Sequence, residues 1–83
     1  MKKEYIVLIP VIFNNSLETT KQFKDREFKS LGEVATEITE ALTEDETTED
    51  EEVLVYSFEG FANAVASKQV DIDKYYTTTV FVV

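Results

Sequence analysis

The sequence predicts a two-layer α+β domain, in which about four mostly antiparallel strands carry two helices on one face in the order ββαβαβ. Three observations lead to this fold class. Short runs of β-branched and aromatic residues occur at 5–13 and 75–83, as is typical of strands. Two segments, 31–43 and 58–67, carry apolar residues at helical spacing on one face. Each helix must bury that face against another element, and a sheet is the available partner.

The size and composition of the chain limit what it can do. Its 83 residues predict a single domain over 1–83, and 43% apolar residues are enough to build one core. It contains no histidine and no cysteine, so Ser–His–Asp triads, Cys–His pairs and thiolate or imidazole zinc sites cannot form within one chain. Two glycines are too few for a glycine-rich phosphate loop. We therefore expect no enzyme, and no catalytic or cofactor-binding residues.

The first apolar run, YIVLIPVIF at 5–13, predicts a strand that is buried on both faces, because apolar residues follow one another without alternation. Pro10 has no backbone N–H to donate to a neighbouring strand. One side of the strand is therefore expected to be open or bulged at Pro10. The Asn-Asn-Ser sequence at 14–16 is a turn signal.

Residues 17–28 are expected to return as an edge strand in a hairpin with the first strand. Phe23 and Phe28 have opposite parity, so they would point to opposite faces of a regular strand. This break predicts a bulge near Asp25 or an end to pairing there. The bases in and beside the segment would block edge-to-edge pairing, or would bind the acidic face of a second copy in a homodimer. They are Lys21, Lys24, Arg26 and Lys29.

The first helix is the most clearly marked element of the sequence. Ser30 and Glu33 form a capping box, with the serine as N-cap and the glutamate at the third helical position. The helix is predicted to run to about Thr43. Its apolar residues fall at i, i+3, i+4, i+7 and i+11 on one face, which is expected to cover the sheet. They are Leu31, Val34, Ala35, Ile38 and Leu42.

The second half of the chain predicts a strand, a helix, a connection and a final strand, at 53–56, 58–67, 68–73 and 75–83. Ser57 is expected to cap the helix. Phe58 and Phe61 are expected to anchor it in the core, because they share its apolar face. Tyr75 and Tyr76 must point to opposite faces of the last strand. One of them should be buried, and the other is a candidate for a contact surface.

Charge is distributed unevenly along the chain. The net charge is −9, yet residues 1–29 hold six bases and four acids, whereas residues 30–83 hold thirteen acids and two bases. Between Ser30 and Ser67 there are eleven acids and no base. Such an acidic surface would be repelled by phosphates, so we expect neither direct nucleic-acid binding nor binding to anionic membranes.

The start of the chain lacks a feature that a targeting segment requires. Two lysines precede the apolar run at 5–13, but no small-residue cleavage site follows it. The run is also far shorter than the roughly 20 residues that span a bilayer. We therefore expect a cytoplasmic protein.

A row of glutamates lies opposite the apolar stripe of the first helix. Glu33, Glu37, Glu40 and Glu44 are spaced by 4, 3 and 4, which places them on one helix face with no lysine to pair with them. The stretch EDETTEDEE at 44–52 continues the row with seven acids in nine positions. Residues that break several local rules at once are expected at functional sites. The candidate partner-binding residues are these acids of the helix face and the loop: Glu33, Glu37, Glu40, Glu44, Asp45, Glu46, Glu49, Asp50, Glu51 and Glu52.

Three interpretations of these acids are open: a solvated face, a charge display for a basic partner, and a cation site. EDETTEDEE lacks the central glycine and the acid register of an EF-hand loop. Asp71 and Asp73 form only a common two-carboxylate pair. A dedicated metal site is therefore not expected, although weak binding of divalent cations is plausible.

The C-terminal stretch VLVYSFEGFANAVASKQVDIDKYYTTTVFVV, residues 53–83, resembles many small proteins encoded by phages and mobile elements. The resemblance consists of a short strand, a Ser-capped helix with Phe in its first turn, a Val-Asp connection and a Tyr-rich last strand. Small acidic proteins of that group often act as nucleic-acid mimics, which inhibit restriction enzymes, CRISPR nucleases or uracil-DNA glycosylase. The resemblance implies such a role here, with no inhibitory motif to carry over.

Two functional hypotheses follow from different classes. The first is a non-enzymatic acidic binding protein, which occupies a basic surface on a nucleic-acid-binding protein with its carboxylate-rich helix face and loop. The alternative is a small oligomeric accessory or assembly protein of phage type, whose acids serve only solubility and whose contacts use an exposed sheet face or an edge strand. A weaker third option is a carboxylate-based enzyme or cation binder.

Overall fold

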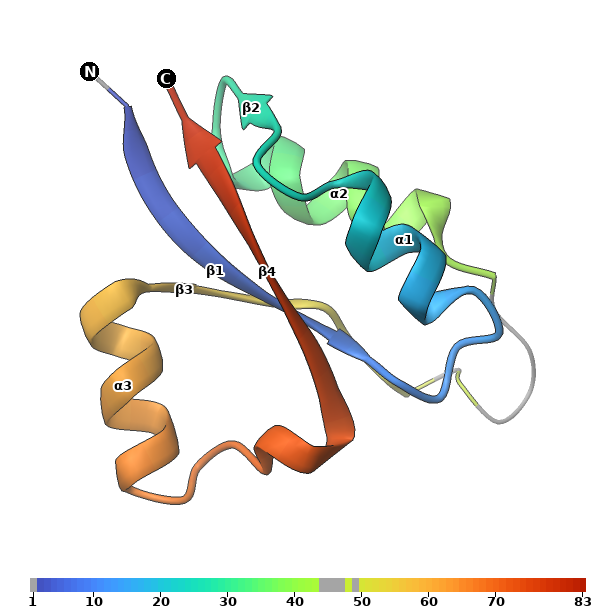
Figure 1. The fold of residues 1–83 in the computed structure, drawn as a ribbon, viewed down its shortest axis with the longest axis vertical. Helices are drawn as coiled ribbons and strands as arrows, with labels where there is room; N and C mark the ends of the chain where they lie inside the picture. The colour runs from blue at the N-terminus through green and yellow to red at the C-terminus, as the bar shows by residue number, and fades with distance from the viewer. Residues whose placement is uncertain (1, 44–47, 49) are drawn as a thin grey trace.

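A four-stranded mixed sheet forms the centre of the molecule (Figure 1). The computed structural model describes residues 2–43, 48 and 50–83. Within these residues the strands are β1 (Lys3–Pro10), β2 (Glu27–Phe28), β3 (Leu54–Ser57) and β4 (Tyr75–Val82). They lie in the order β2-β4-β1-β3, with β1 antiparallel to both of its neighbours and β2 parallel to β4. The prediction of an α+β fold with about four mostly antiparallel strands is confirmed.

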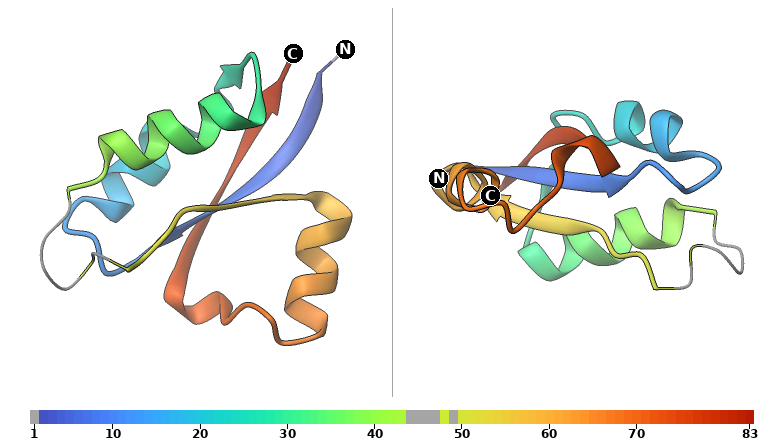
Figure 2. Two further views of the ribbon diagram at one scale, coloured as in Figure 1. Left: turned by 180° about the vertical axis from the view of Figure 1, so that it is seen from behind. Right: turned by 90° about the horizontal axis from the view of Figure 1, so that it is seen from below.

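Helices cover both faces of this sheet. The described residues form α1 (Ser16–Gln22), α2 (Leu31–Ala41), α3 (Phe58–Ala66) and the short 3-10 turn η1 (Ile72–Lys74). Figure 1 shows α1 and α2 on one side of the strands and α3 on the other, and the end-on view in Figure 2 places α1 beside β4 and α2 beside β3. The prediction of a two-layer domain with both helices on one face is therefore wrong.

Strand β1 explains why both faces are covered. Val7, Leu8 and Ile9 are all fully buried, as predicted for this run. Val7 and Ile9 pack in one cluster with residues of α2, whereas Leu8 packs in a second cluster with Ala64 of α3. Neighbouring residues of a strand point to opposite faces. A central strand that is apolar on both faces therefore needs a helix on each.

Pro10 ends β1 in the way that its missing N–H predicts. Pairing with β4 continues to Pro10 opposite Tyr75, but pairing with β3 stops at Leu8 opposite Leu54. One side of the strand is thus open at the proline, and the strand spans Lys3–Pro10 rather than the predicted 5–13. Phe13 is buried in the turn that follows.

The predicted hairpin strand at 17–28 is wrong, because residues 17–22 belong to helix α1 and the strand β2 is only Glu27–Phe28. Helix α1 and its C-cap bury three side chains at the i, i+3, i+7 spacing of a helix: Ser16, Thr19 and Phe23. Two of these are polar, so a search for apolar periodicity misses the helix. The Ser16 hydroxyl donates to the carbonyls of Pro10 and Phe13, the latter at 2.9 Å, which allows it to be buried.

Only the end of this segment joins the sheet. Asp25 has a left-handed φ of 60°, and the chain then runs along β4 to form β2. The Phe81 N–H donates to the Arg26 carbonyl at 2.8 Å, and the Val83 N–H donates to the Phe28 carbonyl at 2.9 Å. The irregularity predicted near Asp25 is therefore present, but it is the turn from helix to strand and not a bulge in a longer strand.

Candidate functional site

Helix α2 carries the central part of the predicted acidic face, and its start is capped as the sequence predicts. The Glu33 N–H donates to the Ser30 hydroxyl at 3.2 Å, and the Lys29 N–H donates to Glu33 Oε2 at 3.2 Å. The glutamate therefore reaches back one residue beyond the expected Ser30 N–H. Because its carboxylate is engaged in the cap and half-buried, Glu33 is less available to a partner than the sequence suggested.

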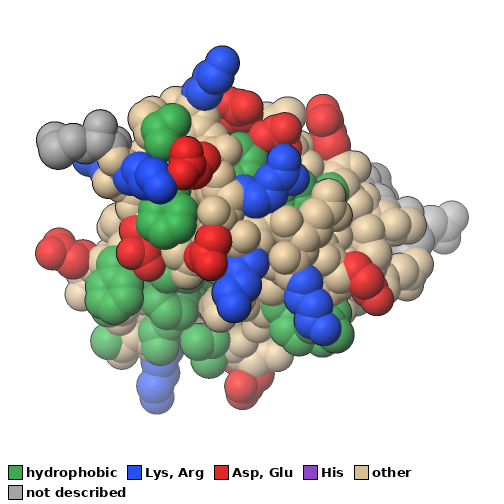
Figure 3. All heavy atoms as spheres, turned by 45° about the horizontal axis from the view of Figure 1, so that its top comes forward, with side chains coloured by type: hydrophobic (Ala, Val, Ile, Leu, Met, Phe, Trp, Pro, Cys, Tyr) green, Lys and Arg blue, Asp and Glu red, His purple; other side chains and the backbone are tan. Residues whose placement is uncertain are grey.

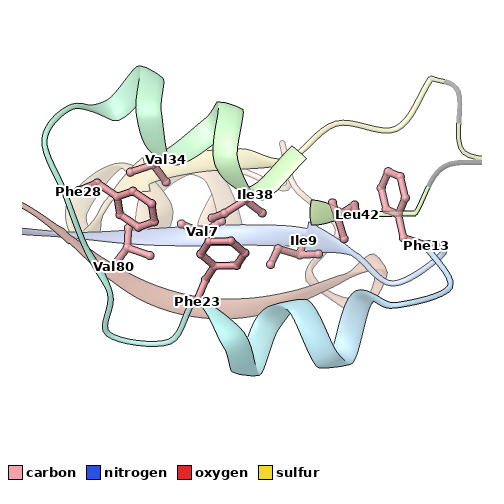
Figure 4. Packing of buried hydrophobic residues seen from close by; sticks show 9 residues of the cluster. All are labelled: Val7, Ile9, Phe13, Phe23, Phe28, Val34, Ile38, Leu42 and Val80. Atoms are coloured by element: carbon pink, nitrogen blue, oxygen red, sulfur yellow. The ribbon is translucent and has the colours of Figure 1, made fainter. Parts of the chain in front are cut away.

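The opposite side of α2 is fixed in the larger core cluster. Val34 and Ile38 are fully buried, and Leu42 is nearly so. Figure 4 shows Val34 and Ile38 directed at the strand that carries Val7 and Ile9. Leu31 is the exception in the predicted stripe, because it is 44% exposed. The middle of the helix is thus held by packing.

Asn15 holds the end of α2 from a distant part of the sequence. Its Nδ2 donates to the Ala41 carbonyl at 2.8 Å, and its Oδ1 accepts from the Thr43 N–H at 2.9 Å. The last carbonyls of a helix lack partners within the helix, so this side chain satisfies one of them. The helix is therefore restrained at its start, its middle and its end.

Replacing Asn15 with alanine is expected to lower the free energy of unfolding by about 1–3 kcal/mol, since two hydrogen bonds are lost and one carbonyl is left without its partner. Asn14, its exposed neighbour, provides the control. Asn14→Ala should change the stability by no more than about 0.5 kcal/mol. Urea denaturation followed by circular dichroism measures both values, and equal costs would show that the Asn15 bonds do not hold the helix end.

Glu37 and Glu40 are the exposed acids of α2. Neither forms an ion pair within the part of the chain that the structure describes, where Lys2 and Glu27 are paired at 2.7 Å. Side chains three residues apart on a helix have Cβ atoms about 5–6 Å apart. The arrangement is a pair of adjacent, uncompensated carboxylates on a restrained helix, which suits contact with a row of cations.

The helix ends before the predicted row of four glutamates is complete. α2 stops at Ala41, and Leu42 has an extended ψ of 141°. This turn directs Leu42 into the core. The row on α2 therefore consists of Glu33, Glu37 and Glu40. Four other predicted partner-binding acids lie outside the described residues: Glu44, Asp45, Glu46 and Glu49.

The last three acids of the predicted loop, Asp50, Glu51 and Glu52, are exposed and lead into β3. The Glu51 N–H donates to the Thr48 carbonyl at 3.0 Å, which closes a turn. Thr48 is almost fully buried. These acids therefore follow a buried residue and lie just before β3 begins.

The basic residues of the first half, Lys21, Lys24, Arg26 and Lys29, are all exposed, but only Arg26 and Lys29 flank the edge strand β2, because Lys21 lies on α1. The Arg26 guanidinium lies 5.0 Å from the centre of the Phe23 ring. On the face drawn in Figure 3, Lys and Arg side chains are spread among acids and do not form one patch. Their binding to the acidic face of a second copy stays a prediction.

The prediction that Phe58 anchors α3 in the core is wrong. The Phe58 side chain is 67% exposed, whereas Phe61 packs against the second core cluster. The Ser57 hydroxyl does accept from the Gly60 N–H at 3.0 Å, so the predicted cap is confirmed. A Cβ atom at Gly60 would lie 3.7 Å from the Tyr56 ring. α3 thus packs on the second core cluster through Phe61 and Ala64, and Phe58 is directed toward solvent.

The two tyrosines of β4 lie on opposite faces, as predicted. Tyr75 is half-buried beside the second core cluster, and Tyr76 is 38% exposed. Burial raises the pKa of the Tyr75 hydroxyl above its ordinary value, and the nearby negative charge of Glu51 adds to the rise. The charge of the Glu51 carboxylate therefore reaches Tyr75, the first residue of β4.

Comparison of the chain with protein-family models, with curated proteins and with solved structures gave no match in any of the three. Among the described residues, no group of three or more acidic side chains is placed to hold a metal ion. No helix in that part of the chain is long and apolar enough to cross a membrane. The function, the phage-type resemblance and the cytoplasmic location all stay predictions.

Proposed function

We propose that this chain is a non-enzymatic acidic binding protein, which occupies a basic surface on a nucleic-acid-binding protein in the manner of a nucleic-acid mimic. The observation that carries the proposal is the exposure of Glu37 and Glu40 on a helix whose other side is fully buried at Val34 and Ile38. A carboxylate on a helix whose backbone is already restrained binds with a smaller entropic cost than a carboxylate on a free chain.

The proposed binding is electrostatic. A nucleic-acid-binding cleft presents lysine and arginine side chains spaced for phosphates, and carboxylates can accept charge-assisted hydrogen bonds from the same donors. The chain has eleven acids and no base between Ser30 and Ser67. Their negative charge would attract a basic partner toward this part of the protein. Glu37 and Glu40 would make the central contacts, and Asp50, Glu51 and Glu52 would extend them.

The chain immobilised on a resin and exposed to a bacterial lysate tests this proposal. We expect it to retain a basic protein that elutes as salt rises, because salt screens exposed charges. Short duplex DNA added to the wash should release the same protein, since both would compete for one cleft. Retention that responds to neither salt nor DNA would contradict the proposal.

The second candidate function is a small oligomeric accessory or assembly protein of phage type. It is favoured by the exposed Phe58, since aromatic residues are enriched in protein interfaces. Figure 3 shows hydrophobic side chains gathered on the part of this face that holds α3. This candidate assigns the acids to solubility alone.

Oligomerisation gives this second candidate its own test. If α3 mediates self-association, the mass measured by sedimentation equilibrium should rise with protein concentration. Phe58→Ser should then return the chain to a monomer, whereas Leu17→Ser, which changes another exposed apolar residue on α1, should not. A monomer at every concentration up to the millimolar range would exclude this candidate.

A further inference from the structure

A small pocket lies at the end of the sheet where β1 finishes and β3 and β4 begin. It has a volume of about 270 Å³ and is lined by Pro10, Val11, Ile12, Glu51 and Lys74. The Val11 N–H donates to the Lys74 carbonyl at 3.0 Å, which joins two of its walls. Ligand pockets for drug-sized molecules are typically about 300–1,000 Å³. This pocket is therefore of a size for one side chain or a small fragment.

The walls of the pocket combine apolar surface with a carboxylate. Val11 and Ile12 are 39% and 47% exposed, so they present apolar surface to the solvent. Glu51 contributes the negative charge, and Lys74 is the single base among the lining residues. Four further acids close to these residues in the sequence are also exposed: Asp50, Glu52, Asp71 and Asp73. The lining itself holds one acid and one base, so it is these neighbouring acids that would favour a cationic occupant.

We propose that this pocket accepts an arginine side chain of a protein partner. The methylene groups of the arginine would pack on Pro10, Val11 and Ile12, and the guanidinium would pair with the Glu51 carboxylate. Arginine suits this position because its apolar stem and charged head are separate, and because its planar head can bond both oxygens of a carboxylate. Buried arginines in pockets also often dominate the energy of protein interfaces. The inference rests on the proposed function, to which it adds an anchoring site away from α2.

Lys74 distinguishes this occupant from others. Its ammonium group would repel a guanidinium in the pocket, so Lys74→Met should strengthen arginine binding. If the pocket instead bound a zwitterionic or anionic molecule, Lys74 would be an attractive partner and the same substitution would weaken binding.

The probe for this proposal is N-acetyl-arginine amide, titrated into the isotopically labelled chain and followed by the amide resonances. We expect saturable shifts that centre on residues 11, 12, 51 and 74. Glu51→Gln should weaken the binding by about fivefold or more, because it removes a charge-assisted pair at a partly open site. Glu52→Gln is the matched control, since Glu52 does not line the pocket. It should change the affinity by less than about twofold.

N-acetyl-leucine amide serves as the uncharged control and should give no saturable shifts. The proposal is overturned if the arginine probe gives no saturable shifts, if Glu51→Gln and Glu52→Gln have equal effects, or if Lys74→Met weakens binding. Reversal of Glu37 and Glu40 should leave probe binding unchanged, because these residues do not line the pocket. Lysate capture tests the proposed function without this probe, so the two failures can be told apart.

Discussion

Reversing Glu37 and Glu40 to lysine in one variant is expected to abolish capture of the basic partner, with a loss of at least 100-fold in affinity. Hydrogen bonds to charged groups contribute about 1.5–3 kcal/mol each, and every 1.4 kcal/mol is a factor of ten in affinity. Two lost contacts alone therefore account for about 100-fold, and the new lysines would in addition repel the partner's bases. The fold should survive, because both side chains are exposed.

The matched control for this variant is Glu18→Lys with Glu59→Lys. These residues are exposed on α1 and α3, and their reversal changes the net charge by the same amount. If the position of the acids on α2 matters, the control should lose only the part of the affinity that comes from long-range attraction. Equal losses in the two variants would mean that net charge, and not the face of α2, retains the partner.

Ile38→Ala is expected to lower the free energy of unfolding by about 2–5 kcal/mol, which is the range for truncating a buried isoleucine and leaving a cavity. Ile38 is fully buried between α2 and the sheet, in the cluster that contains Val7, Ile9 and Phe28. Domains of this size are stable by only about 5–15 kcal/mol, so the loss would be a large fraction of the total. Thermal unfolding should occur at least about 10 °C lower.

Leu31→Ala on the same helix is the control for Ile38→Ala. Leu31 is 44% exposed, so its truncation should cost less than about 1 kcal/mol. Urea denaturation of both variants gives the comparison. If Ile38→Ala cost no more than Leu31→Ala, α2 would not be anchored in the core and could not hold Glu37 and Glu40 in fixed positions.

The sequence contained enough information to place α2 but not to place its end. The capping box at Ser30 and the apolar stripe through Val34 and Ile38 are local signals, and the structure contains both. The end at Ala41 depends on Asn15, which is 26 residues away. Contacts of this kind are set by the tertiary fold, so a pattern read along the chain extended the helix to about Thr43.

Helix α1 was missed because its buried side is mostly polar. Ser16 and Thr19 are almost completely buried, with the Ser16 hydroxyl bonded to backbone carbonyls. Apolar periodicity is the main sequence signal for a helix, and these residues do not contribute to it. Including small polar residues in the pattern from Ser16 to Phe23 would have shown helical spacing.

The signal for helices on both faces of the sheet is present in the sequence, in the apolar run at 5–13. A strand at 5–13 that is buried on both faces is incompatible with helices on only one face. In the structure α3 covers the second face, where its Ala64 packs in one cluster with Leu8. The prediction that Phe58 is a core anchor assigned the wrong face of α3 to the core.

Most of the candidate site could be named from the sequence, because charge and spacing are visible there. The sequence does not show which of these carboxylates are already hydrogen-bonded within the protein. Glu33 is engaged in the cap by Lys29, and the pocket that Glu51 lines requires residues from three separate segments to come together. Only the fold brings Pro10, Glu51 and Lys74 to one end of the sheet.

The most direct test of the central claim is the footprint of the captured partner on the labelled chain, measured by amide chemical shifts on titration. The proposal predicts that the largest changes fall on the exposed turns of α2 around Glu37 and Glu40, with further changes at residues 50–52. It also predicts that these changes diminish as salt rises. Changes confined to α3 and β3, around Phe58 and Tyr56, with α2 unaffected, would contradict it.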